Sequence, residues 1–84
     1  MSVKLWIGNV PPEASDEDLV ELVKRYCIRE GKVVLRVDGD GTRPGRVLEF
    51  ARMTPVELEE IVGRIDGLSW RNRSLLAYPL LYAT

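Results

Sequence analysis

The pattern of apolar and polar residues predicts a strand, a helix, two strands, a second helix and a last strand. The four predicted strands, in which side chains alternate or β-branched residues gather, cover residues 4–8, 32–37, 46–50 and 74–78. The segment over residues 38–45 contains three glycines and a proline, so it is expected to join two strands as a hairpin loop. Pro79 is expected to end the last strand.

Both predicted helices begin with clear capping signals. Ser15 is a suitable N-cap, and the acidic residues 16–18 after it complement the positive end of a helix dipole. Thr54, Pro55 and Glu57 combine an N-cap hydroxyl, a proline at the first helical position and a capping-box carboxylate. The buried stripes are expected to be Leu19, Leu22, Val23 and Tyr26 in the first helix and Leu58, Ile61, Val62, Ile65 and Leu68 in the second.

Two strand–helix–strand units in this order predict an α+β fold, the split βαβ (ferredoxin-like) sandwich, in which two helices cover one face of a four-stranded antiparallel sheet. Strand alternation turns Val33, Leu35 and Val37 toward the helices. The predicted core comprises Leu5, Ile7, Leu19, Leu22, Val23, Leu35, Leu48, Phe50, Leu58, Ile61, Ile65 and Leu75. The open face is assigned Lys4, Trp6, Gly8, Val34, Arg36, Val47, Glu49, Ser74, Leu76 and Tyr78, and it is unusually apolar for an exposed sheet.

Length and composition indicate one ordinary globular domain. A chain of 84 residues is enough for one domain and too short for two, so a single domain over residues 1–84 is expected. No run of about 18 apolar residues could span a bilayer, so no membrane partner is expected. The chain enters its first strand without the apolar stretch of a signal peptide, which predicts a cytoplasmic protein. Cys27 is the only cysteine and is expected to fill the core.

The charge balance does not by itself indicate a nucleic-acid partner. The net charge is -1, with 12 basic and 13 acidic residues, whereas nucleic-acid binders commonly carry a basic excess. The charges are nevertheless uneven along the chain. Arginines gather at positions 43, 46, 71 and 73, which leaves room for one basic pole.

Catalysis and metal binding find little support in the residues. The chain has no histidine and no nucleophile beside a recognisable base, so neither an enzyme nor a cofactor is expected. Residues 38–42 with Glu49 superficially follow a calcium loop, but Arg43 stands where such a loop needs glycine. We interpret this segment as a turn.

Three segments together resemble the RNA recognition motif (RRM) family. These are the hexamer Leu5-Trp6-Ile7-Gly8-Asn9-Val10, the first-helix pattern from Ser15 to Tyr26, and Ile65-Asp66-Gly67 followed by Trp70-Arg71-Asn72-Arg73-Ser74-Leu75. Trp6 stands at the stacking position of the hexamer. The octamer of the family, if it ends at Phe50, has Gly45 and Val47 where two aromatic rings are usual.

The resemblance implies a module that binds single-stranded RNA on its open sheet face. Bases are expected to stack on Trp6 and Tyr78, with basic side chains at the phosphates. The predicted RNA-binding residues are Lys4, Trp6, Asn9, Arg36, Arg43, Arg46, Val47, Leu76 and Tyr78. Because only two rings are available, affinity is expected to be modest.

Several alternatives remain open at this point. The alternative is a protein partner or a homodimer, which would bind the apolar patch Trp6, Val34, Val47, Leu76 and Tyr78 together with the tail over residues 80–82. Residues 79–82 could instead cover Trp6. Arg43 and Arg46 could form an ordinary solvated hairpin tip. Trp70 is expected to pack at the core or its rim.

Overall fold

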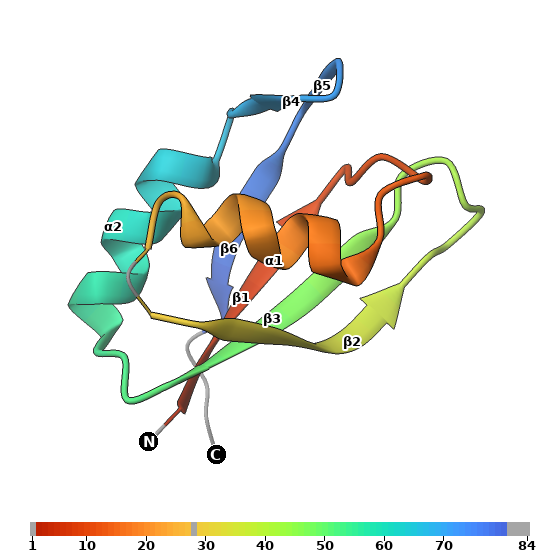
Figure 1. The fold of residues 1–84 in the computed structure, drawn as a ribbon. Helices are drawn as coiled ribbons and strands as arrows, with labels where there is room; N and C mark the ends of the chain where they lie inside the picture. The colour runs from red at the N-terminus through yellow and green to blue at the C-terminus, as the bar shows by residue number, and fades with distance from the viewer. Residues whose placement is uncertain (1, 28, 81–84) are drawn as a thin grey trace.

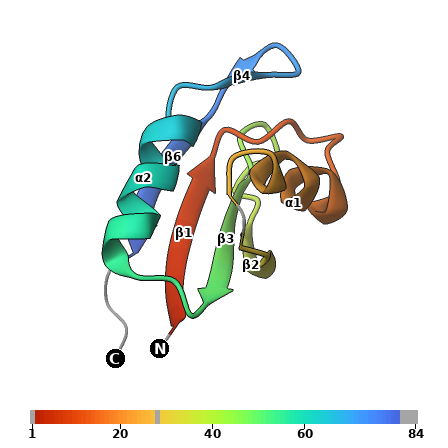
Figure 2. The same cartoon turned by 60° about the vertical axis from the view of Figure 1, so that its left-hand side comes forward.

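The computed structural model describes residues 2–27 and 29–80. Its elements are β1 (Ser2–Gly8), α1 (Asp16–Lys24), β2 (Gly31–Val37), β3 (Gly45–Ala51), α2 (Pro55–Ile65), β4 (Ser69–Trp70), β5 (Arg73–Ser74) and β6 (Leu76–Leu80). Four strands form an antiparallel sheet in the order β2-β3-β1-β6, and both helices lie on one of its faces (Figure 1). The predicted α+β sandwich is confirmed, and Figure 2 shows β1 running between the two helices.

Both helices begin where the capping signals predict. The Ser15 hydroxyl accepts a hydrogen bond from the Asp18 N–H at 3.0 Å, and the Asp18 carboxylate accepts one from the Ser15 N–H at 3.0 Å. Thr54 and Glu57 repeat this reciprocal pair at 3.2 and 3.1 Å. The hydrogen bonds from the backbone N–H groups of Ser15 and Thr54 lower the pKa values of Asp18 and Glu57 below their ordinary range.

The core lies between the sheet and the helices, and all but one of its predicted members are buried. The Phe50 ring packs over Gly31, its neighbour on β2, and a side chain at position 31 would overlap that ring. Cys27 is half-buried against this core, in keeping with the prediction that it packs there. Core positions that the sequence analysis missed include Val10, Ala14, Met53 and Ala77.

A β-bulge at Val34 overturns part of the predicted face assignment. Val33 pairs with Leu48, whereas Leu35 already pairs with Val47, so β2 holds one extra residue against β3. One extra residue turns each later side chain of the strand to the opposite face of the sheet. Leu35 is therefore 54% exposed on the open face instead of buried in the core, Val37 shares that face, and Arg36 turns to the helix side.

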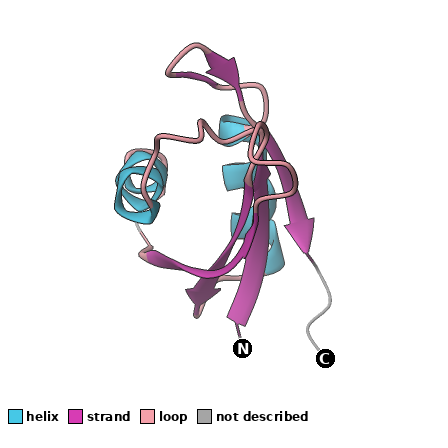
Figure 3. Ribbon diagram, turned by 90° about the vertical axis from the view of Figure 1, so that its right-hand side faces the viewer, coloured by secondary structure: helices cyan, strands magenta, loops and turns pink. Residues whose placement is uncertain are grey.

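A short hairpin that was not predicted as strands precedes the last strand. β4 and β5 pair across Arg71 and Asn72, whose φ angles of 51° and 67° suit a tight two-residue turn. The hairpin projects beyond the end of the main sheet (Figure 3). Trp70 packs at the rim of the core as predicted. The guanidinium carbon of Arg71 lies 4.8 Å from the centroid of the Trp70 ring.

Pro79 does not end the last strand. It lies within β6, opposite Leu5 of β1, because β6 is an edge strand and an edge strand can accommodate a residue without an N–H. None of the described helices is long and apolar enough to cross a membrane. The cytoplasmic location stays a prediction.

Candidate nucleic-acid interface

The open face of the sheet carries an apolar surface centred on β1 and β6. Trp6 is flanked across the strands by Val47 of β3 and Tyr78 of β6. Tyr78 is 51% exposed and Leu76 is 45% exposed, so both are accessible, as predicted. Val47 is only 5% exposed, which makes it a buried support for its neighbours and corrects its assignment as a contact residue.

The indole of Trp6 lies over two glycines. A side chain at Gly45 would overlap Cη2 and Cζ2 of the ring, and a Cβ at Gly8 would come to 3.0 Å from its Nε1. In the resemblance to RRM domains, Gly45 aligns with an octamer position that usually carries a ring. The ring of Trp6 fills the space beside Gly45, so the sheet has an aromatic surface there.

Trp6 is half-buried, which leaves part of its ring accessible. Of the segment that could cover it, Pro79 and Leu80 continue β6 beside β1. The remaining residues, 81 and 82, lie outside the described residues.

A hollow at one end of the open face brings several predicted residues together. Its lining consists of Trp6, Gly8, Asn9, Arg43, Ser74 and Leu76. Arg43 is exposed, and its side chain has no hydrogen bond or ion pair within the described ranges 2–27 and 29–80. The accessible ring of Trp6 therefore lies next to Arg43, whose guanidinium N–H groups can donate to a ligand.

Asn9 and Arg73 hold the loops around this hollow. The Asn9 amide donates to the Ser74 carbonyl at 3.0 Å and accepts from Arg73 Nη1 at 3.3 Å. The same Nη1 donates to the Thr42 carbonyl at 2.6 Å, which fixes the β2–β3 loop next to Arg43. Both ends of the Asn9 amide are thus engaged within the protein. In the sequence, Arg73 belongs to a charge cluster and to the segment that resembles RRM domains, but neither pattern predicts these contacts.

Arg36 and Arg46 lie on the helix side, away from the open face. Arg46 pairs with Ile7 in the sheet and is 7% exposed. Its guanidinium donates to Asp16 at 3.1 Å and to Asp38 at 2.8 Å. Arg36 donates to the other oxygen of Asp16 at 3.0 Å, a hydrogen bond that raises the Arg36 pKa. The predicted place of these two arginines on the open face is therefore corrected, since their charges join α1 to the sheet, and their contact with RNA stays a prediction.

Lys4 lies on the open face as predicted, two residues before Trp6. In the sheet register Lys4 and Lys32 flank Glu49, which makes a charged row at this end of the face. Lys4 and Arg43 are thus the predicted cations that remain on the surface around Trp6.

The calcium-loop pattern does not form an ion site in the described residues. Asp38 is engaged by Arg46, and Asp40 accepts from the hydroxyl and the N–H of Thr42 at 2.7 and 2.9 Å. These hydrogen bonds lower the Asp40 pKa. No group of metal-ligating side chains occurs in the part of the chain that the structure describes.

Comparison with known proteins finds this fold among solved structures. No protein-family model and no curated protein matches the chain. Among solved structures, the RRM3 domain of Pes4 superposes with a TM-score of 0.75 at 12% identity, covering 96% of this chain and 94% of that one. The RRM3 domain of Mip6 gives 0.67 at 12% identity, covering 90% of each chain. The NONO-1 homodimer of C. elegans gives 0.61 at 21% identity, covering 89% of this chain and 27% of that one.

Proposed function

We propose that this chain binds single-stranded RNA through the open face of its sheet. The chain has the fold of RRM domains, and the observation that carries the proposal is the Trp6 indole, set over Gly45 and next to the exposed ring of Tyr78. Two neighbouring rings on a sheet face that both helices leave open suit the stacking of unpaired bases. Leu76 adds apolar contact at the hollow beside Trp6.

Single-stranded RNA fits this surface better than a duplex does. The faces of bases in a duplex are stacked on one another, so an aromatic platform can reach them only where the strand is unpaired. The surface also carries few cations, whereas duplex recognition rests mainly on contacts to phosphates and 2′-hydroxyls.

The cations of the proposed site are Lys4 and Arg43. Lys4 precedes Trp6 on β1, and Arg43 lines the hollow beside Gly8 and Asn9, so a backbone that meets both would run along β1 past Trp6. Each phosphate contact contributes about 0.7 to the salt slope of single-strand binding. With two such contacts the dependence on salt should be shallow and the affinity modest.

Fluorescence anisotropy with a short, labelled, mixed-sequence single-stranded RNA tests the proposal. The same sequence annealed to its complement is the control. The single strand should bind saturably at low salt, and the duplex should bind much more weakly. Equal binding of the two forms, or no binding of the single strand, would overturn the proposal.

Self-association is a second candidate, supported by four large apolar side chains on the open face. Leu35, Val37, Leu76 and Tyr78 are between 45% and 54% exposed, and patches of this kind often mark protein interfaces. Sedimentation of the parent chain and of a Leu35→Ser variant separates the candidates. A dimer that the substitution dissolves, together with undetectable RNA binding, would favour self-association.

A further inference from the structure

The hollow beside Trp6 is lined by side-chain donors that have no hydrogen-bond partner. Its volume is about 460 Å³, within the range of pockets that hold ligands. The donors belong to Trp6, Arg43 and Ser74, whose side chains make no hydrogen bond in the part of the chain that the structure describes. Asn9 adds none, because both ends of its amide are engaged, by the Ser74 carbonyl and by Arg73. A ligand in the hollow must therefore supply acceptors.

The indole N–H of Trp6 is open to such a ligand. Nε1 is the ring atom closest to a Cβ built at Gly8, at 3.0 Å, so this edge of the ring faces the lining of the hollow. The described residues contain no buried side-chain nitrogen or oxygen without a partner, so the unpaired Nε1 reaches solvent. Glycine at position 8 keeps the approach to this N–H free of a side chain. An indole nitrogen can only donate.

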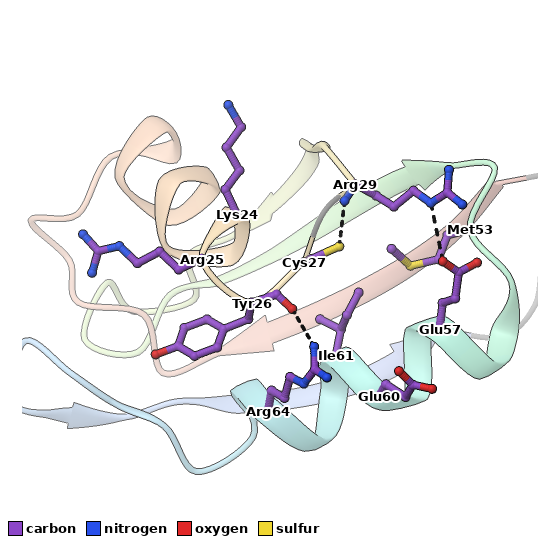
Figure 4. A pocket seen from close by; sticks show the side chains of 10 residues that line it. All are labelled: Lys24, Arg25, Tyr26, Cys27, Arg29, Met53, Glu57, Glu60, Ile61 and Arg64. Carbon is purple, nitrogen blue, oxygen red and sulfur yellow. Dashed lines mark hydrogen bonds and ion pairs between the residues drawn. The ribbon is translucent and has the colours of Figure 1, made fainter.

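The larger groove between the end of α1 and α2, drawn in Figure 4, is not a comparable site. Its residues Met53 and Ile61 are only 3% and 4% exposed and belong to the core. Its arginines Arg29 and Arg64 are held by a carboxylate and a backbone carbonyl of the same lining (Figure 4). The groove therefore offers neither an apolar slot nor a set of unpaired donors around one position.

We propose that the hollow binds a base with a keto oxygen at its outer edge, uracil or guanine, and that this oxygen accepts the Trp6 N–H. The base belongs to the bound single strand, so its recognition rests on the proposed function. Arg43 holds the phosphate at the rim of the hollow, and the base enters with the edge farthest from its sugar. At that edge uracil and guanine carry a carbonyl oxygen, whereas cytosine and adenine carry an amino group.

Hydrogen-bond pairing accounts for the choice between keto and amino bases. A keto oxygen accepts the indole N–H, whereas an amino group would set two donors against each other and leave both unpaired. Among the side chains that line the hollow, Ser74 alone carries an acceptor that no described residue engages. Stacking on the face of Trp6 does not discriminate, because every base has a π-face. The preference therefore arises at the edge of the ring.

The first test compares a labelled oligocytidine with strands of equal length in which one central base is uracil, guanine or adenine. By anisotropy, the uracil and guanine strands should bind roughly five- to tenfold more tightly than the other two, the equivalent of about 1–1.4 kcal/mol. Equal affinities, or an order that follows the size of the base, would overturn this inference and leave the proposed function intact. Absence of binding by every strand would overturn both.

Two tryptophan variants assign the preference to one N–H. Trp6→Phe retains a ring and removes the indole N–H, so the ratio of the affinities for the uracil strand and the oligocytidine should fall toward one. Trp70→Phe is the matched control, because its indole does not line the hollow, and it should keep the ratio of the parent chain. Thermal unfolding checks that both variants fold. A ratio that survives in Trp6→Phe, or that falls equally in both variants, would overturn the role of the Trp6 N–H.

An NMR titration of the parent chain tests the same hydrogen bond without a substitution, which covers the case in which Trp6→Phe no longer binds RNA. A hydrogen bond to oxygen deshields an indole N–H proton. The Trp6 resonance should therefore move downfield with the uracil strand and not with the oligocytidine. An upfield shift, or the same shift with both strands, would overturn the inference.

Discussion

The ring of Trp6 occupies the space that a side chain at Gly45 would need. These residues lie on neighbouring strands, and an aromatic ring over a glycine of the adjacent strand is a known way to cover exposed backbone. The arrangement gives a steric reason for glycine at position 45. A ring at position 45 and the ring of Trp6 could not both be accommodated in this conformation.

Gly45→Ala should therefore displace the indole. We expect a loss of about 1–3 kcal/mol in the free energy of unfolding from overpacking, with weaker RNA binding. Denaturant unfolding followed by tryptophan fluorescence measures both the stability and the change around the ring. Gly63→Ala is the control, since Gly63 lies in α2 with nothing within 4 Å of an added Cβ and should gain up to about 1 kcal/mol. Equal effects of the two substitutions would contradict the packing of Trp6 on Gly45.

The bulge at Val34 predicts that replacing Leu48 of β3 or Leu35 of β2 by alanine changes the free energy of unfolding by different amounts. Leu48 is fully buried, so Leu48→Ala should lower the free energy of unfolding by roughly 2–5 kcal/mol. Leu35 is 54% exposed, so Leu35→Ala should change the free energy of unfolding by no more than about 0.5 kcal/mol. Chemical denaturation of both variants checks the pair. A large loss of stability in Leu35→Ala would show that Leu35 is buried, as uninterrupted alternation along β2 predicts, and would contradict the bulge.

Two arginines near the hairpin should respond differently to alanine. Arg43→Ala should weaken RNA binding across sequences and reduce the salt slope by about 0.7, with stability unchanged. Arg46→Ala should instead destabilise the fold by about 1.5–3 kcal/mol, because it removes the hydrogen bonds of a buried guanidinium to Asp16 and Asp38, although Asp16 keeps its ion pair with Arg36. Binding titrations over a range of salt concentrations, run beside thermal melts, distinguish the two. The roles assigned here would be wrong if Arg43→Ala unfolded the chain or left the salt slope unchanged.

The capping boxes predict a particular loss of stability in acid. Asp18 and Glu57 have pKa values below their ordinary 3.8 and 4.5, so they stabilise the fold above those values and lose this contribution as pH falls through the lowered pKa. Melting temperatures should fall as pH drops below about 4.5. The double variant Asp18→Asn, Glu57→Gln should be less stable at neutral pH and show a shallower decline in acid. If the melting temperatures of the parent and the double variant fell identically with pH, the capping boxes would not explain the loss of stability in acid.

The sequence predicts the helices and most of the core because their signals are local. The caps at Ser15 and Thr54 and the helical spacing of buried leucines each depend on a few neighbouring residues. The bulge is different. Residues 33–35 are all apolar and support either face assignment, so only the pairing with β3 decides it.

The candidate site is likewise predictable only in part. Trp6, Tyr78 and Leu76 follow from strand alternation in strands without a bulge. The buried position of Arg46 depends on Asp16, which lies 30 residues away in the chain. The anchoring of the β2–β3 loop by Arg73 spans 31 residues, and neither contact leaves a local sequence pattern.

The two tryptophans provide the most direct test of the open face as an RNA-binding surface. Trp6 lies on that face, whereas Trp70 packs at the core rim under Arg71, so each indole N–H signal reports on a different place. A two-dimensional NMR titration with mixed-sequence single-stranded RNA should shift the Trp6 signal and leave that of Trp70 in place. Trp6→Ala should then cost about 1–3 kcal/mol of RNA affinity without changing the oligomeric state. A Trp6 signal that stays unchanged at saturating RNA, or one that moves no more than Trp70, would contradict the account.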